Sequence, residues 1–389
     1  MADSVGRPNH VKTAASSPEP SPHTRKVWDF GVRGFHWLLV VAVVTAGLTG
    51  FFGARNALDI HLIAGTAIAA LVGFRVVWGV LGGGFARFSS FLFAPATIIA
   101  YARGLLRGTT RRYLGHNPLG GLMVFALLAV LTLIVVSGVI ALGGQDKQGP
   151  LAFVTPFAVG WFVRGVHKLL ALMLVGMVAA HLAGVLYESR HENENLTAAM
   201  LTGRKRDEPG VAAQTGQGSW RLASILLLLG GVGITAGTIG LTARPALGVP
   251  TGPLDGAYAR ECGACHMVYH PSLMPASSWQ AILADLGHHF GEDASLDPAI
   301  TEQLRTYLTA NAAERWDTLP AVKFRQSIDP KDSVRIDATG FWRRIHHNIP
   351  DATFTNRLVG GRGNCSACHS DAAAARFAPQ NIEIPEELQ

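Results

Sequence analysis

Five apolar runs dominate the first 241 residues of this 389-residue chain. They cover residues 35–53, 61–82, 119–142, 163–187 and 221–241. Each run is about as long as the 20 residues that a helix needs to cross a bilayer. Helical periodicity within them is weak, as expected where lipid and other helices surround a helix, and their Gly and Ala residues suit close packing. The pattern predicts five transmembrane helices.

Composition supports a membrane protein. Mean hydropathy is +0.25, and charged residues make up 15% of the chain, against about 25% in soluble domains. The pI is near 9.3, but the basic residues that raise it are unevenly distributed along the chain. Residues 1–241 carry 20 Lys and Arg against 10 Asp and Glu, whereas residues 242–389 carry 13 against 17. The basic excess therefore belongs to the membrane part, where it reports topology, and no nucleic-acid partner is expected.

The positions of Lys and Arg between the spans predict the orientation. Basic residues gather in the N-terminal tail and after the second and fourth spans: Arg7, Lys12, Arg25, Lys26 and Arg33; Arg87, Arg103, Arg107, Arg111 and Arg112; Arg190, Arg204, Lys205 and Arg206. The other connections offer only Arg55, Lys147 and Arg164. We expect a cytoplasmic N-terminus and, after five spans, a periplasmic C-terminal domain in a bacterial inner membrane.

Three further segments have their own character. Residues 1–25 are polar and rich in Pro and Ser, contain no apolar stretch of a secretion signal, and are expected to be a disordered cytoplasmic tail. Residues 85–121 mix aromatic, aliphatic and Arg residues and predict an amphipathic helix along the membrane surface. Beyond residue 242 the chain is polar, with short helical patterns and no strand-rich stretch, so a covalent cofactor is expected to supply part of its core.

All four cysteines lie in two copies of one motif, CGACH at 262–266 and CSACH at 365–369. C-x-x-C-H attaches c-type haem: the thiols form thioethers to the porphyrin, and the adjoining His binds iron. A zinc ribbon needs its Cys pairs about 15–20 residues apart, whereas these are 103 positions apart. Disulfides or redox thiols would leave the His after each pair unexplained. The motifs predict two covalent haems, held by Cys262, Cys265, His266, Cys365, Cys368 and His369.

Each c-type haem needs a second axial ligand, and spacing alone leaves several candidates: His270, His288, His289, His346, His347, Met267 and Met274. Helical context favours one His of LGHHFGED for one haem and one of RRIHHNIP for the other.

Four histidines fall within or at the ends of the apolar runs, where a polar ring is costly and by default functional. His167 and His181 are 14 residues apart on the fourth span, which is about 21 Å of helical rise on nearly the same face. His61 matches the outer level and His36 the inner level. This spacing predicts two bis-histidine b-type haems stacked across the bilayer, although each His alone could be an ordinary core residue.

Arg75 follows His61 by the same 14 residues, so it is expected at the inner level. A buried guanidinium there would suit a haem propionate. The alternative is an arginine that extends to the cytoplasmic surface.

Two families share these features. Residues 26–206, with KVWDFGVRGFHW, ARFSSF, RYLGHNPLGG and ENLTAAMLTGRK, resemble the bacterial cytochrome b561 family, related to b-type subunits of nickel-iron hydrogenases. The resemblance implies a four-helix core with His36, His61, His167 and His181 as haem ligands. Residues 256–370, with ECGACHMVYHPSLMPASSW, HHFGEDASLDP and NCSACH, are similar to periplasmic dihaem cytochromes c. That similarity implies distal ligands at His289 and His346.

We therefore expect a mostly α protein with four parts: the tail 1–25, a four-helix dihaem membrane domain at 26–206, a linker and fifth transmembrane helix at 207–245, and a largely helical, haem-wrapped domain at 246–389. Two haem b and two haem c would link the quinone pool to a soluble periplasmic redox protein. Two alternatives are an oxidoreductase acting directly on quinol or superoxide, and a cytochrome anchor subunit of a larger redox complex.

Overall fold

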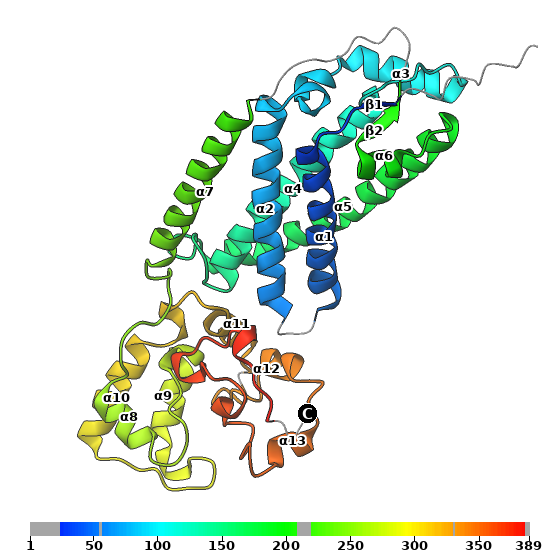
Figure 1. Ribbon diagram of the computed structural model, residues 1–389. Helices are drawn as coiled ribbons and strands as arrows, with labels where there is room; N and C mark the ends of the chain where they lie inside the picture. The colour runs from blue at the N-terminus through cyan, green and yellow to red at the C-terminus, as the bar shows by residue number, and fades with distance from the viewer. Residues whose placement is uncertain (1–23, 54–56, 208–218, 330, 386–389) are drawn as a thin grey trace, which may run out of the picture.

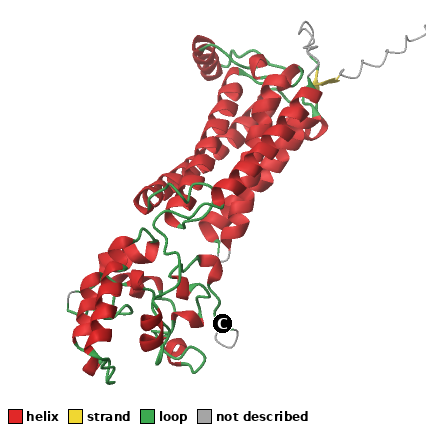
Figure 2. Ribbon diagram, turned by 90° about the vertical axis from the view of Figure 1, so that its left-hand side faces the viewer, coloured by secondary structure: helices red, strands yellow, loops and turns green. Residues whose placement is uncertain are grey.

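The computed structural model describes residues 24–53, 57–207, 219–329 and 331–385. Helices dominate these residues, which confirms the predicted fold class, and Figures 1 and 2 show a bundle of long helices beside a domain of short ones. Most of the tail predicted at 1–25 lies outside the described residues.

The α-helices of the described chain are α1 Phe30–Phe52, α2 Leu58–Leu81, α3 Pro95–Arg107, α4 Pro118–Gln145, α5 Phe157–His191, α6 Leu196–Thr202, α7 Trp220–Thr242, α8 Gly256–Cys262, α9 Ala276–Ala284, α10 Pro298–Ala310, α11 Leu319–Ser327, α12 Gly340–Ile345 and α13 Asp351–Thr355. Two short strands, β1 Thr24–Lys26 and β2 Arg204–Arg206, pair antiparallel.

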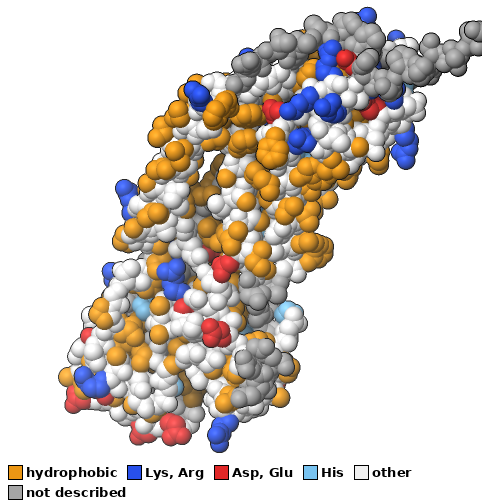
Figure 3. Space-filling model, in the orientation of Figure 1, with side chains coloured by type: hydrophobic (Ala, Val, Ile, Leu, Met, Phe, Trp, Pro, Cys, Tyr) orange, Lys and Arg blue, Asp and Glu red, His pale blue; other side chains and the backbone are white. Residues whose placement is uncertain are grey.

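The five predicted spans are present as α1, α2, α4, α5 and α7, each long and apolar enough to cross a membrane. The main difference is the length of α5, which has 35 residues and continues past the apolar run. Large apolar side chains are exposed along all five helices, as on a surface that faces lipid (Figure 3). The protein is a multi-pass membrane protein.

The bundle is built from two helix pairs, α1 with α2 and α4 with α5, joined by contacts between α2 and α4, while α7 packs against α2. Close approach of α4 and α5 depends on two glycines. A Cβ on Gly160 would lie 2.4 Å from the backbone nitrogen of Gln145, and one on Gly144 would lie 2.6 Å from the Cα of Gly160. Small residues therefore bring these two helices into backbone contact.

The buried core of the bundle lies between the two levels at which histidines were predicted. It comprises Ala42, Ile68, Val72, Val130, Leu131 and Leu174. Leu174 stands seven residues from both His167 and His181 on α5. An apolar layer thus separates the outer level from the inner one.

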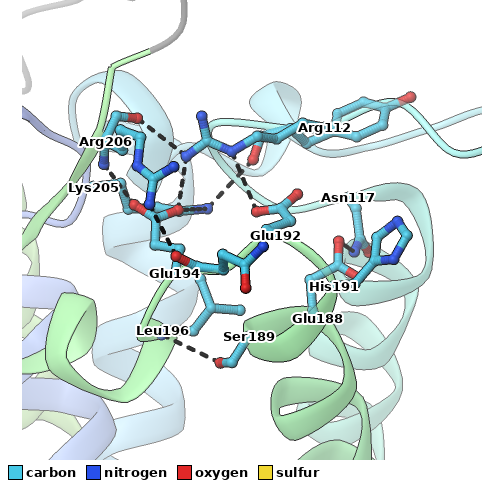
Figure 4. Close-up of polar contacts among 12 residues, drawn as sticks. Arg112, Asn117, Glu188, Ser189, His191, Glu192, Glu194, Leu196, Lys205 and Arg206 are labelled. Atoms are coloured by element: carbon cyan, nitrogen blue, oxygen red, sulfur yellow. Dashed lines mark hydrogen bonds and ion pairs between the residues drawn. The ribbon is translucent and has the colours of Figure 1, made fainter. Parts of the chain in front are cut away.

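The end of the bundle away from the C-terminal domain carries a polar cluster, shown in Figure 4. Arg112, ahead of α4, forms ion pairs with Glu192 at 3.4 Å and with Glu194 at 2.8 Å. Burial lowers the pKa of Lys205, while Glu192 and Glu194 favour its charged form. These contacts tie the chain after α5 to the segment that contains α3, which forms within the predicted amphipathic stretch.

The C-terminal domain has two small cores. One surrounds Tyr258, Trp279, Leu304 and Leu308, and the other surrounds Phe341 and Trp342. In the described part of this domain, strand pairing is limited to the isolated bridges His289–Glu292 and His369–Ile382. The expected absence of a strand-rich stretch is confirmed for these residues.

Candidate haem sites

His61 of α2 and His167 of α5 face each other across the bundle, with ring centroids 6.1 Å apart. A metal–imidazole bond is about 2.0 Å long, so two rings bound to opposite sides of one ion have centroids about 6 Å apart. The observed separation therefore fits a bis-histidine haem. His36 lies on α1 and His181 on α5, at the other level.

Each outer ring contacts a backbone carbonyl, a side-chain hydroxyl and a glycine of a neighbouring helix. Nδ1 of His61 lies 3.0 Å from the carbonyl oxygen of Ala46, with the Thr49 hydroxyl at 3.3 Å. The carbonyl can only accept, so Nδ1 carries the proton. A Cβ on Gly50 would lie 3.1 Å from this ring. Nε2 is thereby left as the nitrogen available to a metal.

The same three contacts recur on α4. Nδ1 of His167 lies 3.0 Å from the carbonyl oxygen of Ile134 and 3.2 Å from the Ser137 hydroxyl, and a Cβ on Gly138 would lie 3.2 Å from the ring. In both helices the hydroxyl residue lies three positions after the carbonyl residue, and the glycine lies four positions after it. At the inner level, by contrast, Nδ1 of His36 is buried with no hydrogen-bond partner among the described residues.

The CGACH motif follows α8, which ends at Cys262. His266 lies 6.3 Å from His289 between ring centroids, and the two planes are 29° apart. His266 Nδ1 is 2.7 Å from the Met267 carbonyl oxygen, which fixes its tautomer. The neighbouring His288 is 86% exposed and bonded to Asp285 instead. The structure thus brings His289, rather than His288, to the first motif.

Two other candidates for this site are engaged elsewhere. His270 is buried with its Nδ1 2.9 Å from the Ser272 hydroxyl, and burial lowers its pKa to about 4. Met274 belongs to the apolar core around Tyr258.

The CSACH motif shows the same arrangement. His369 and His346 have ring centroids 6.2 Å apart, and His346 stacks on Trp342 at 4.4 Å. His347 is exposed, with Nδ1 near the Arg344 carbonyl oxygen. A largely apolar cavity of about 210 Å³ is lined by both histidines and by Cys365 and Cys368. An apolar cavity bounded by two thiols and two imidazoles suits a porphyrin ring.

The cysteines do not fit the alternatives to haem attachment. The structure joins none of the four in a disulfide. Burial raises the pKa of Cys262 and of Cys365 to about 11, whereas redox-active thiols have lowered values. No three His, Cys, Asp or Glu side chains gather into a metal site in the described part of the chain, as a zinc ribbon would require.

Comparison with known proteins finds a separate match for each part of the chain. Residues 27–203 match the family model of prokaryotic cytochrome b561, and residues 258–377 match that of dihaem cytochrome c. The chain joins a cytochrome b561 domain to a dihaem cytochrome c domain. Haem b and haem c are thus its cofactors, and it is a membrane protein of haem-based electron transfer.

Two curated relatives and two solved structures are similar to parts of the chain. The probable Ni/Fe-hydrogenase B-type cytochrome subunits of Azotobacter vinelandii and Azotobacter chroococcum mcd 1 are 30% and 29% identical over 131 residues, covering 27% of this chain and 53% of each relative. The chain therefore spans about half the length of the curated relatives it matches. DHC of Rhodobacter sphaeroides is 35% identical, and the match covers 32% of this chain and 98% of the DHC chain with a TM-score of 0.26. The diheme cytochrome c of Shewanella baltica OS155 is 34% identical, with 35% and 96% coverage and a TM-score of 0.28.

Arg75 lies in the cytochrome b561 domain with only 2% of its surface exposed. Its guanidinium donates to the Ala86 carbonyl oxygen at 3.2 Å and lies 4.7 Å from the centre of the Phe88 ring. The segment after α2 therefore covers this arginine. A role at a haem propionate stays a prediction, as do the ligand roles of the histidines.

His116 was not singled out by sequence reasoning, yet it is enclosed at the same end of the bundle. Its ring lies 4.7 Å from Trp28 and 4.5 Å from Phe91. Burial, with smaller contributions from the charges of Arg75 and Lys205, lowers its pKa to about 3. Its place in a polar loop, before α4, gave no sign of this burial.

We expect His61→Ala to remove one extractable b-type haem and His181→Ala to remove the other, because each variant loses one axial ligand while the other level keeps both. Optical spectra of the purified variants measure this, with His191→Ala at the end of α5 as control. Unchanged haem content in both variants would show that the pairing is wrong. Loss of both haems in His61→Ala would instead indicate that the bundle itself has collapsed.

Gly138→Val should displace the His167 ring, because even a Cβ at this position would lie 3.2 Å from it. We expect the low-spin electron paramagnetic resonance signal of one b-type haem to shift, while the other b-type signal stays in place. Gly176→Val is the control, since a Cβ on Gly176 would meet nothing within 4 Å. An unchanged signal in Gly138→Val would mean that this glycine does not hold the ring.

Proposed function

We propose that the chain carries electrons across the membrane, between the quinone pool and a soluble periplasmic redox protein, using two haem b and two haem c. When bound, the haems supply reversible one-electron chemistry. The observation that carries the proposal is the recurrence of histidine pairs at one separation: 6.1 Å in the bundle, 6.3 Å at the first attachment motif and 6.2 Å at the second. We also propose that the chain divides into the tail 1–25, the four-helix membrane domain 26–206, the linker and fifth transmembrane helix 207–245, and the C-terminal domain 246–389.

Within this scheme each set of residues has a stated role. His61 with His167, and His36 with His181, would hold the outer and the inner haem b. His266 with His289, and His369 with His346, would bind the c-type irons, while Cys262, Cys265, Cys365 and Cys368 fix the porphyrins covalently. Arg75 would face a propionate of the inner haem. The Ala46 and Ile134 carbonyls orient the outer imidazoles and raise their basicity.

The distribution of charge supports the proposed orientation. Arg112, Lys205 and Arg206 lie at the bundle end that faces away from the C-terminal domain. Basic residues favour the cytoplasmic side. We therefore place this end in the cytoplasm, which puts the C-terminal domain in the periplasm. The apolar outer surface of the bundle would face membrane lipid.

The names of the curated relatives favour a second candidate, in which the chain serves as the cytochrome subunit of a larger redox complex. Such a chain would co-purify with a catalytic partner in gentle detergent, and its haems would be reduced by the substrate of that partner rather than by quinol.

The proposed function is tested by adding quinol to the purified chain in lipid nanodiscs and following the b-type and c-type absorbance bands. We expect both to become reduced, and the c-type band to follow more slowly, or not at all, in His61→Ala. His191→Ala is the control. Failure of quinol to reduce any haem would contradict the quinone link, and undiminished c-type reduction in His61→Ala would contradict a route through the bundle.

A further inference from the structure

The loop between α4 and α5 makes an ion pair with the C-terminal domain. Lys147 Nζ lies 2.7 Å from Asp317 Oδ2, and the lysine side chain is only 2% exposed, against 34% for the aspartate. Lys147 also donates to the Thr155 carbonyl oxygen at 3.1 Å. Because the cation is buried, this pair is screened by salt far less than a surface pair.

The Asp317 carboxylate also caps the N-terminus of α5. Asp317 Oδ2 accepts a hydrogen bond from the backbone N–H of Phe157, the first residue of α5, at 2.7 Å. The N-cap position of α5 is Pro156, which provides no side-chain acceptor. The first N–H groups of a helix have no partner within it, and the positive end of the helix dipole favours an anion there. A residue of the C-terminal domain thus supplies the cap that the membrane helix lacks.

Contacts around this ion pair come from separate parts of the chain. The Leu247 N–H, beyond α7, donates to the Ala152 carbonyl oxygen at 2.9 Å. Asp317 N–H donates to the Gly248 carbonyl oxygen at 2.9 Å, and Gly248 has a φ of +64° that favours glycine. Lys323 Nζ lies 4.1 Å above the Trp161 ring of α5. The C-terminal domain and the bundle are therefore joined by several contacts rather than by one surface ion pair.

The C-terminal segment shows which haem site the interface presents to the bundle. The Pro379–Asn381 turn contacts α2, and Figure 1 shows the C-terminal domain beneath the bundle end where α2 begins. This segment is bonded back to the second attachment motif: Ser370 N–H donates to Asn381 O at 3.1 Å, and Glu383 N–H to Cys368 O at 2.8 Å. Among the described residues, α8, which ends in the first motif, makes no comparable contact with the bundle.

We propose that Asp317 is a docking residue that locks the C-terminal domain onto the bundle, with the CSACH site turned toward the membrane and the CGACH site turned outward to a redox partner. Lys147 and the Phe157 N–H are its two anchors. The lock fixes the position of the second c-type site relative to the outer end of α2, where His61 lies. This arrangement goes beyond the proposed function and holds whatever the membrane electron donor is.

Hydrogen exchange of the full haem-loaded chain in nanodiscs tests the lock. Asp317→Asn keeps the shape of the side chain but removes its charge. Since a hydrogen bond to a charged group is stronger than one to a neutral group, we expect the Phe157 amide to exchange about tenfold faster. Exchange should also rise at residues 379–384 but not at 262–270. Lys147→Met should reproduce the effect, and Glu302→Gln, which disrupts an exposed pair with Arg305, is the control.

A zero-length carbodiimide cross-link on the unmodified chain provides a second test, independent of any variant. Mass spectrometry should find Lys147 joined to Asp317. The proposal would be overturned by unchanged exchange at Phe157 in Asp317→Asn, by an equal rise at 262–270 and 379–384, or by the absence of this cross-link. None of these readouts depends on quinol, so failure of the quinone link leaves them unaffected.

Discussion

The separation between paired imidazole rings is the constraint on which the rest of the structure depends. Two rings can bind one iron from opposite sides only when their centroids lie about 6 Å apart. His61 and His167 belong to helices that are far apart in the sequence, so α2 and α5 must keep a fixed distance. The apolar layer that packs Ile68 and Val72 of α2 with Leu174 of α5 helps to set that distance, because dense packing leaves little room for adjustment. The backbone contact between Gly144 and Gly160 in turn holds α5 against α4.

Different surroundings distinguish the sites. The outer rings donate to backbone carbonyls, which makes them more basic ligands, whereas Nδ1 of His36 has no such partner among the described residues. Arg75 adds a buried positive charge toward the other end of α2. In the C-terminal domain the second attachment motif lines an apolar cavity and is connected to the bundle through the Pro379–Asn381 turn, while His266 of the first motif is exposed. Imidazole side chains are thus placed in environments of different polarity and access.

The sequence predicted much of this architecture, because bilayer length and helical rise are simple constraints. Five apolar runs gave the five long helices, and the 14-residue spacing of His167 and His181 gave the two levels. Spacing alone left His288 and His289 open, and only the family resemblance implied His289; the turn after α9, which brings His289 to the first motif, follows no local pattern. The burial of His116 and the capping of α5 by Asp317 could not be predicted, since both depend on contacts between segments distant in the chain.

We propose that one chain holds haems of two kinds, in equal number, inside the membrane and outside it. Acid-acetone extraction of the purified full-length chain, followed by pyridine haemochrome spectra of both fractions, measures this directly. The account predicts two extractable b-type and two covalently bound c-type haems per chain, because the membrane histidines only coordinate whereas each C-x-x-C-H motif forms thioethers. A ratio far from one, or the absence of covalent haem, would contradict it.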